Sequence, residues 1–403
     1  MASNDPTTVD RISVLPDSLL HHILSLMPIE EAFITHAFSK GWRYLWTSLY
    51  NFYFNCELYN EEYVSFVDYV LAHSVSPKIK EFVLHFHDPN EYKSALSRWL
   101  SFAVEKKVEN VVLWSYSEDD ACPLPEFFYT CCPALETMEF NSCKRFTRLE
   151  IRSSKLKTLK LIDYGDNGRS LDDFKCRLVD VTSVVNARLT FNITCIKDIQ
   201  DDHGEEVDDE EDSCGDYHQV FSILVQDYLQ KLSCATDLTI ASWFTEVLCM
   251  LQFKGVLIPE LKCKYVTLEL QMETFNLYRA ADLLQASPYV ETLNIDMHTM
   301  YFYKSRCQFE SRYLAKGANI DLQSWVACFV FPNLKNVRIT NSFGCLADHF
   351  KQGYDKLFKL SEFLLKRATV LEKFIIISKT RRSEITKAAG SFLPQDMRNV
   401  ALY

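Results

Sequence analysis

The residues of this 403-residue chain most able to do chemistry directly are its fourteen cysteines and ten histidines. Cys131 and Cys132 are adjacent, and adjacent thiolates have poor geometry for binding one metal ion. Cys214 lies near His218, but no second pair of ligands accompanies them, and the chain contains no CxxC pair. Thiols in a long chain without a secretory signal are expected to stay reduced, and most of these lie in apolar patterns. We therefore expect no metal site and no cofactor.

Motifs that position reactive groups are also missing. The sequence contains no phosphate-binding P-loop, no GxSxG, no HExxH and no GxGxxG. Glycine accounts for only 10 of the 403 residues, so loops that cradle phosphate are scarce. We expect a protein that is not an enzyme. The alternative, an enzyme with an unrecognised site, has no residue in its support.

Carboxylates are concentrated in one acidic run, Asp198 to Asp216, which has eleven Asp or Glu and no Lys or Arg. The chain has 54 acidic and 43 basic residues, so its net charge of −11 comes from this run and the remainder is balanced. The spacing of a calcium-binding EF-hand loop is absent. The run is interpreted as a solvated, disordered insertion at 198–216, and the balanced remainder shows no basic field for nucleic acid.

The elements that would position functional side chains follow from a repeated pattern beyond Asn51. An apolar residue is followed by apolar residues three and five positions later, mostly at intervals of 21 to 30 residues. A tenth occurrence reads Leu189 and Phe191, with Asn186 at its first position. The other nine hexamers begin at Ile79, Val108, Leu135, Leu156, Ala235, Cys263, Val290, Leu334 and Leu371. Each hexamer predicts a short strand whose second and third apolar residues point into a shared core.

This spacing and pattern resemble the degenerate leucine-rich repeats (LRRs) of plant proteins. The resemblance implies a solenoid of parallel strands joined by helical or irregular return segments, such as 91–107 with Leu96, Leu100 and Ala103. An ordinary α/β sheet is the alternative, because it could imitate the hexamer in a few places.

Residues that flank the second and third apolar positions are expected on one concave face of the strands. Their polar, chemically mixed side chains suit a protein or peptide surface better than an apolar small molecule. The candidate target-binding residues are Thr137, Glu139, Thr158, Lys160, Arg188, Thr190, Thr292, Asn294, Arg338 and Thr340.

The stretch Asp10 to Leu49 predicts three short helices with more apolar side chains than so small a unit can bury. Pro16 and Asp17 open the first helix, and Pro28 ends it. The second helix is predicted over 30–38, with Ala37 and Phe38 on its apolar side. Ser39 is predicted to cap a third helix that carries Trp42, Leu45, Trp46 and Leu49.

The order DRISxLPDxLLxxILSxMP, followed by EEAxxT and SKxWRxLW, resembles the F-box. The resemblance implies docking on the Skp adaptor of Skp–cullin–F-box (SCF) ubiquitin ligases. The chain departs from the plant form at Gly41, where an Arg is usual, and glycine in a helix predicts a weaker third helix. The residues expected to form the core of this unit and its adaptor-binding surface are Leu15, Pro16, Leu19, Leu20, Ile23, Leu24, Trp42, Leu45 and Trp46.

The C-terminal part, from about Phe331, predicts a strand, a helix with Leu360, Phe363, Leu364 and Leu365, and a second strand. It resembles the FBD region that ends many plant F-box proteins, with matches at LKxVxI, EFLLKxA and LEK. The expected fold is α/β: a disordered tail at 1–9, an F-box at 10–50, degenerate repeats over 51–330, and an FBD-like cap at 331–403.

The sequence as a whole predicts a non-catalytic ubiquitin ligase subunit that holds an adaptor, and through it a cullin, and that captures an unknown target protein for ubiquitination. The alternative is a leucine-rich-repeat scaffold whose F-box no longer engages the ligase. The first nine residues lack the features of a signal peptide, and the longest apolar run, Trp325 to Phe331, is far shorter than a membrane span. We expect no membrane or nucleic-acid partner, and a location in the cytoplasm, the nucleus or both.

Overall fold

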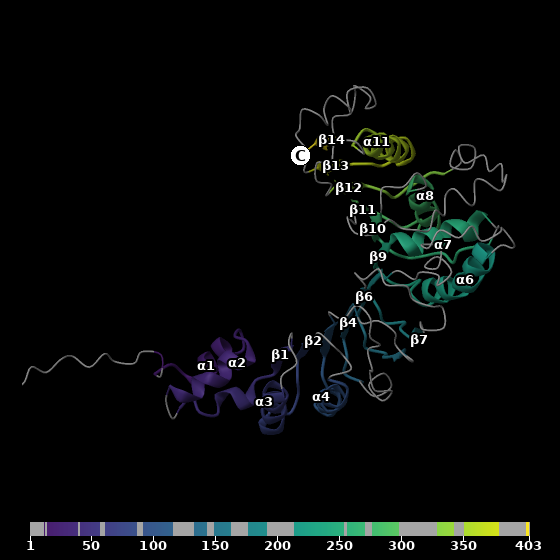
Figure 1. The fold of residues 1–403 in the computed structure, drawn as a ribbon. Helices are drawn as coiled ribbons and strands as arrows, with labels where there is room; N and C mark the ends of the chain where they lie inside the picture. The colour runs from purple at the N-terminus through teal and green to yellow at the C-terminus, as the bar shows by residue number, and fades with distance from the viewer. Residues whose placement is uncertain are drawn as a thin grey trace, which may run out of the picture. The chain divides into compact units, whose positions relative to one another are not determined.

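The chain forms two compact units, Met1–Leu156 and Lys157–Tyr403. The computed structural model describes residues 12, 14–38, 41–56, 61–86, 92–115, 133–142, 149–162, 176–191, 213–253, 256–270, 276–297, 329–341, 350–378 and 400–402. The ribbon of each unit alternates strands with helices (Figure 1).

The first unit begins with short helices and continues into strands. Its elements are α1 (Asp17–Leu24), α2 (Ile29–Ile34), η1 (Thr35–Ala37), η2 (Leu45–Ser48), β1 (Asn51–Cys56), α3 (Glu61–His73), β2 (Glu81–Phe86), α4 (Lys93–Glu105), β3 (Asn110–Ser115), β4 (Thr137–Asn141) and β5 (Leu149–Arg152). Strands β1 to β4 pair in parallel in chain order. Parallel neighbours require a crossover between strands, and α3 and α4 provide two of these crossovers.

The N-terminal helices differ in part from the prediction. Pro16 and Pro28 precede α1 and α2 as expected, because proline is tolerated where a helix begins. The second helix is shorter than predicted: α2 ends at Ile34 and continues only as the 3₁₀ turn η1, which leaves Phe38 71% exposed. The predicted third α-helix is wrong, since only the 3₁₀ turn η2 forms after a turn at 41–44. Gly41 costs helix stability at this point, and a residue with little helical preference favours a turn.

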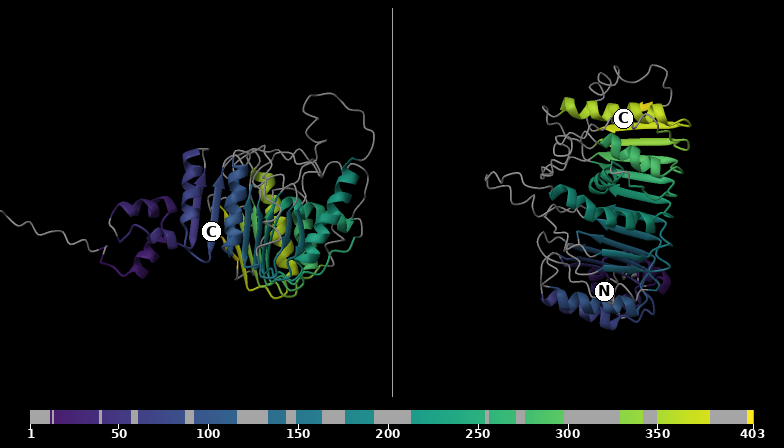
Figure 2. Two further views of the ribbon diagram at one scale, coloured as in Figure 1. Left: turned by 90° about the horizontal axis from the view of Figure 1, so that it is seen from below. Right: turned by 90° about the vertical axis from the view of Figure 1, so that its right-hand side faces the viewer.

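The second unit repeats the strand and return arrangement. Its elements are β6 (Thr158–Ile162), β7 (Cys176–Asp180), β8 (Asn186–Thr190), α6 (Ser213–Lys231), β9 (Asp237–Ala241), α7 (Ser242–Phe253), β10 (Tyr265–Leu270), α8 (Asn276–Ala286), β11 (Thr292–Met297), β12 (Asn336–Asn341), α11 (Phe350–Arg367), β13 (Lys373–Ser378) and β14 (Val400–Leu402). Strand β6 pairs with β8, and β8 through β14 then follow in chain order, all in parallel. The stacked strands of this unit, with helices on one side, are visible in the right-hand view of Figure 2.

The repeat prediction is confirmed, because every hexamer coincides with a strand of a parallel sheet. The mixed α/β fold class is confirmed with it. One register was wrong: Ala187 pairs with Leu159 and Leu238, so the tenth hexamer begins at Val184 and not at Asn186. Ala187 is buried at 3% exposure, and its small side chain hides the pattern in the sequence. A further hexamer, Leu49, Phe52 and Phe54, marks β1 and was missed because Leu49 was assigned to the third helix.

The predictions for the return segment, the C-terminal helix and the acidic run fall at least partly on residues that the structure describes. The predicted helical or irregular return segment over 91–107 contains α4, whose Leu96, Leu100 and Ala103 are fully buried. In the C-terminal part, α11 buries Leu360 and Leu364 as expected. Helix α6 begins at Ser213, so the last residues of the predicted acidic insertion are helical, and 198–212 lie outside the described residues. No helix within the described ranges is long and apolar enough to cross a membrane.

Candidate binding surfaces

Helix α1 divides its apolar side chains between the core and the solvent. Leu20 and Leu24 are buried at 3% and 0% exposure, whereas Leu19 and Ile23 are 49% and 39% exposed. Both pairs are four residues apart, and this spacing places each pair on one face of a helix. Other large apolar side chains of the helical unit are also exposed: Ile12, Val14, Leu26, Ile34, Phe38 and Tyr44. We call Val14, Leu19, Ile23 and Leu26 the α1 face.

The other residues predicted for this site separate in the same way. Trp42 and Trp46 are buried at 5% and 4% exposure and belong to the core of the small helical unit. Leu15 and Leu45 are half-buried, and Pro16 is exposed. The Trp46 indole Nε1 donates to the backbone oxygen of Arg43 over 3.1 Å. The structure therefore divides the predicted residues between the core of the helical unit and its surface, and adaptor binding by the exposed ones stays a prediction.

The helical unit is packed against the first helix of the repeats, α3, through aromatic rings. Phe33 lies edge-on to Trp46, Phe66 and Tyr69, with ring centroids 5.1, 5.3 and 5.9 Å apart. Tyr69 also stacks on His73 at 4.0 Å. Such ring pairs add packing energy beyond the area that they bury. The contact joins α2 and η2 to α3 within the first unit.

A polar contact supplements this packing at the other end of α3. The Tyr63 hydroxyl donates to a Glu30 carboxylate oxygen and accepts from the Asn55 backbone N–H at 3.1 Å. Burial, followed by the neighbouring Glu30 carboxylate, raises the pKa of Tyr63 well above its usual range. Burial also raises the pKa of the Cys56 thiol to about 12. Both groups therefore stay neutral at physiological pH, as their buried positions require.

The outward face of the second unit carries, in rows, the predicted target-binding residues other than Thr137 and Glu139. Strand register places Lys160 beside Arg188, and Asn294 beside Arg338, each pair on adjacent strands. Thr158 and Thr292 lie one row nearer the strand starts, and Thr340 one row further along. Lys160, Arg188, Asn294 and Thr340 are half-buried and Arg338 is exposed, as expected for positions that alternate with core residues.

One of the predicted residues is less accessible than expected, and another is paired within the protein. Thr190 is only 5% exposed, and its Oγ1 has no hydrogen-bond partner within the described part of the chain. Arg188 forms an ion pair with Glu269 at 2.6 Å, although β9 lies between their strands. The intervening outward residues of β9, Thr239 and Ala241, are small enough to allow this bridge. Thr190 is thus buried, and Arg188 is engaged within the protein itself.

The predicted residues do not include the middle of this face. Thr239, Thr267 and Glu269 occupy the outward positions of β9 and β10, between the residues that were predicted. Their hexamers had been recognised, so the same alternation along each strand was the signal that could have found them. Thr267 Oγ1 lies 3.4 Å from Asn294 Nδ2, which donates to it.

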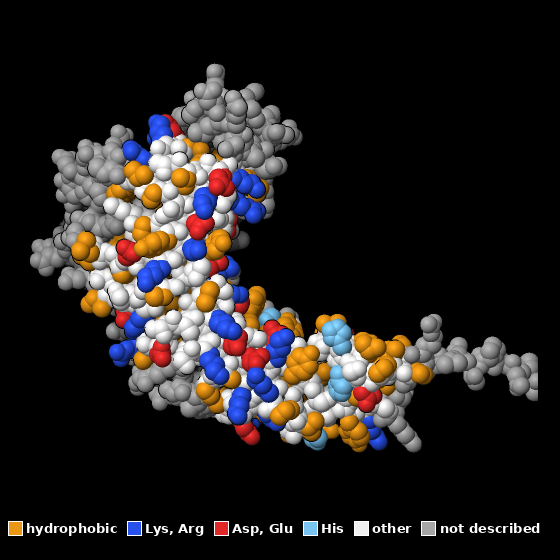
Figure 3. Space-filling model, turned by 180° about the vertical axis from the view of Figure 1, so that it is seen from behind, with side chains coloured by type: hydrophobic (Ala, Val, Ile, Leu, Met, Phe, Trp, Pro, Cys, Tyr) orange, Lys and Arg blue, Asp and Glu red, His pale blue; other side chains and the backbone are white. Residues whose placement is uncertain are grey.

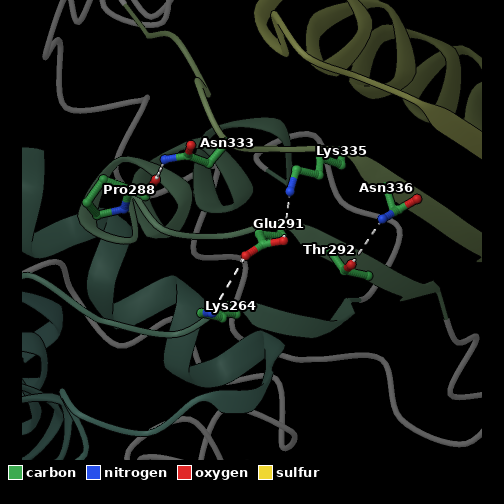
Figure 4. Close-up of polar contacts among 7 residues, drawn as sticks. All are labelled: Lys264, Pro288, Glu291, Thr292, Asn333, Lys335 and Asn336. Atoms are coloured by element: carbon green, nitrogen blue, oxygen red, sulfur yellow. Dashed lines mark hydrogen bonds and ion pairs between the residues drawn. The ribbon is translucent and has the colours of Figure 1, made fainter.

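A polar ladder runs along the starts of the strands in the same unit (Figure 4). Glu291 lies between Lys335 at 3.0 Å and Lys264 at 3.8 Å. The hydrogen bond from Lys335 lowers the pKa of the Glu291 carboxyl, and Glu291 raises the pKa of Lys335. Since these groups are exposed, the ladder fixes neighbouring strand starts without contributing much stability.

The outward face of the first unit differs in chemistry. It carries the predicted Thr137 and Glu139 on β4, together with aromatic side chains on β1, β2 and β3. Seen from behind in Figure 3, hydrophobic side chains and histidines gather over the N-terminal elements of this unit. Among the residues that the structure describes, no group of three or more His, Cys, Asp or Glu could hold a metal ion.

Comparison with known proteins gives a context for these surfaces. The family model of the F-box domain matches residues 12–54, which include α1, α2, η1, η2 and most of β1. An F-box/LRR-repeat protein of Arabidopsis thaliana is 25% identical, with 92% of this chain and 88% of that protein covered. A second one is 24% identical over 71% of this chain and 70% of its own length. An F-box/FBD/LRR-repeat protein of the same plant is 29% identical over 40% of this chain and 39% of its own.

Proposed function

We propose that this chain, which has an F-box domain at its N-terminus and relatives named as plant F-box/LRR-repeat proteins, is the substrate-recognition subunit of an SCF ubiquitin ligase. The F-box binds a Skp-type adaptor, and through it a cullin, while the strand faces of the repeats capture a target protein. The subunit does no chemistry itself. It raises the effective concentration of the target near the ubiquitin-conjugating machinery. Such a role places it in the cytoplasm, the nucleus or both.

The observation that supports this role is the exposed α1 face. Val14 and Leu26 are 75% and 74% exposed, and Leu19 and Ile23 add to the same surface. Several large apolar side chains left exposed on one small folded unit favour an interaction site there. Burying one such side chain is worth about 1.5–3 kcal/mol, so four of them favour a protein partner over solvent.

The proposal is tested by co-purification of the full chain with a plant Skp-type adaptor. The Leu19→Asp/Ile23→Asp variant changes only exposed side chains, so it is expected to keep the fold and to lose the adaptor. Leu257→Asp is the matched control, because Leu257 is 90% exposed on the second unit. The control is expected to recover as much adaptor as the wild type. Equal recovery with the double variant would refute the docking surface.

A repeat scaffold that does not engage the ligase is the second candidate. The observation in its favour is the loss of the third helix, of which only η2 forms. If the wild-type chain recovers no adaptor while its fold is intact, this second role replaces the first.

A further inference from the structure

The helical unit, which consists of α1, α2, η1 and η2, has little stability of its own. Helix α1 has eight residues and α2 has six, and η1 and η2 are 3₁₀ turns of three and four residues. An isolated helix shorter than about 12–15 residues is marginal in water, so these elements depend on packing for their order. The order of the α1 face is therefore set by the elements against which the helical unit packs.

The first half of α3, the return helix of the first repeat, contacts α2 (Figure 1). The Tyr63 hydroxyl, in the first turn of α3, donates to a Glu30 carboxylate oxygen near the start of α2. Close to one turn further along, the Phe66 ring lies edge-on to the Phe33 ring, with centroids 5.3 Å apart. These two contacts hold the first half of α3 against α2.

The second half of α3 contacts η2. The Trp46 ring lies 6.2 Å from the Tyr69 ring and 6.5 Å from the His73 ring, centroid to centroid. Beyond the end of α3, the Val75 backbone N–H donates to the Thr47 carbonyl oxygen over 2.8 Å. Helix α3 is thus held against the helical unit from its first turn to its last.

Other side chains of α3 tie this helix to the repeats. Val67 and Val70 are buried at 0% exposure, and Leu71 is buried at 5%. The Asp68 carboxylate accepts a hydrogen bond from the Trp99 indole of α4 over 2.8 Å. Helix α3 therefore contacts both the helical unit and the next return helix.

Contacts also lead from η2 to the helix that carries the α1 face. Leu20 and Leu24 of α1 are buried, and His21 Nδ1 lies 3.2 Å from the Ser48 hydroxyl of η2. Helices α1 and α3 are therefore joined through η2, and α2 adds its own contacts to α3. Contiguous packed elements of this kind are a physical basis for energetic coupling between two sites.

We infer that the helical unit and α3 open and close as one cooperative unit, so that adaptor docking on the α1 face stabilises the return helix of the first repeat. Tyr63 and Phe66 are the positioning residues of this unit, because they contact α2 and lie outside the α1 face. The inference rests on the proposed function for the adaptor, but the shared opening does not. A ligand that binds only the closed form suppresses the opening of every segment that opens with it. This linkage is reciprocal, so a target that stabilises α3 also tightens adaptor binding.

The first arm of the test measures hydrogen exchange on the free full-length chain. Tyr63→Phe removes the hydroxyl from its hydrogen bonds to Glu30 and Asn55, and it is expected to speed exchange about tenfold over 17–34 and over 61–73 alike. Tyr289→Phe makes the same change on a ring of the second unit that is 47% exposed, and it should alter neither segment. Unchanged exchange with Tyr63→Phe, or faster exchange in only one of the two segments, would overturn the inference.

The second arm adds a purified Skp-type adaptor to the wild-type chain at about ten times its measured Kd. Exchange is expected to slow about tenfold over both 17–34 and 61–73, and to stay unchanged over α8 of the second unit. Protection of 17–34 without 61–73 would overturn the inference and leave the proposed function intact. Protection of neither segment would refute the proposed function, and the result with Tyr63→Phe then decides the shared opening by itself.

Discussion

The Asp68 carboxylate offers a sharp test of how neighbouring repeats are coupled. Its Oδ1 accepts a hydrogen bond from the Trp99 indole Nε1 at 2.8 Å, and its Oδ2 accepts one from Arg98 at 2.6 Å. Trp99 is 1% exposed, whereas the Arg98 side chain is 52% exposed. One carboxylate on α3 therefore makes a part-buried bond and an exposed bond to the same helix, α4.

The two bonds should differ in energy. Asp68→Ala leaves the buried indole N–H without an acceptor, which costs about 1–3 kcal/mol in the free energy of unfolding. Arg98→Ala removes a solvent-exposed ion pair, which costs about 0–1 kcal/mol. In a Trp99→Phe background the donor is gone, so Asp68→Ala should cost only about 0–1 kcal/mol more.

Urea denaturation of the full-length variants measures these differences, provided that the slope with denaturant is unchanged. Asp68→Ala should lower the free energy of unfolding by about 1–2 kcal/mol more than Arg98→Ala does. The reasoning is refuted if the two variants are equally stable, or if the Trp99→Phe background leaves the cost of Asp68→Ala unchanged.

Three further predictions concern titration, the acidic run and the second unit. The raised pKa of Cys56 means that its thiol ionises at lower pH in the unfolded chain than in the folded one. The contribution of this thiol to the free energy of unfolding is therefore fully present below the ordinary thiol pKa of 9.0 and is lost as pH rises toward about 12. Cys56→Ala should flatten that loss in urea denaturation at alkaline pH. Replacing Gln200 to Asp212 by a short Gly-Ser linker should leave the thermal midpoint nearly unchanged, because the run has almost nothing apolar to bury, and a large drop would show that it is packed. Charge reversal at Lys160 and Arg338 should weaken target recovery in proximity labelling without altering adaptor binding, and unchanged recovery would move the target site off this face.

Much of the fold could be predicted because burial imposes a period on the sequence. Leu20 and Leu24 on α1, and the apolar pair of each hexamer, face a core that accepts few other residue types. The prediction failed where a residue is small or serves two elements. Ala187 fills a core position with one methyl group, and Leu49 ends the helical unit while it begins the first hexamer.

The surfaces were less predictable than the core, for a physical reason. Solvent accepts many residue types, so alternation along a strand shows which way a side chain points and says nothing about its neighbours. The bridge from Arg188 across β9 to Glu269, and the stack of His85 on Trp114, both depend on strand register. Register joins residues that are roughly thirty to eighty positions apart, which no local pattern encodes.

Hydrogen exchange on the intact chain, alone and with purified Skp-type adaptor, tests the central claim most directly. Adaptor binding is expected to slow exchange over residues 14–34, which hold the α1 face and α2, and to leave the strands β6 to β13 unchanged. No change over 14–34, or protection confined to the repeats, would contradict docking through the F-box.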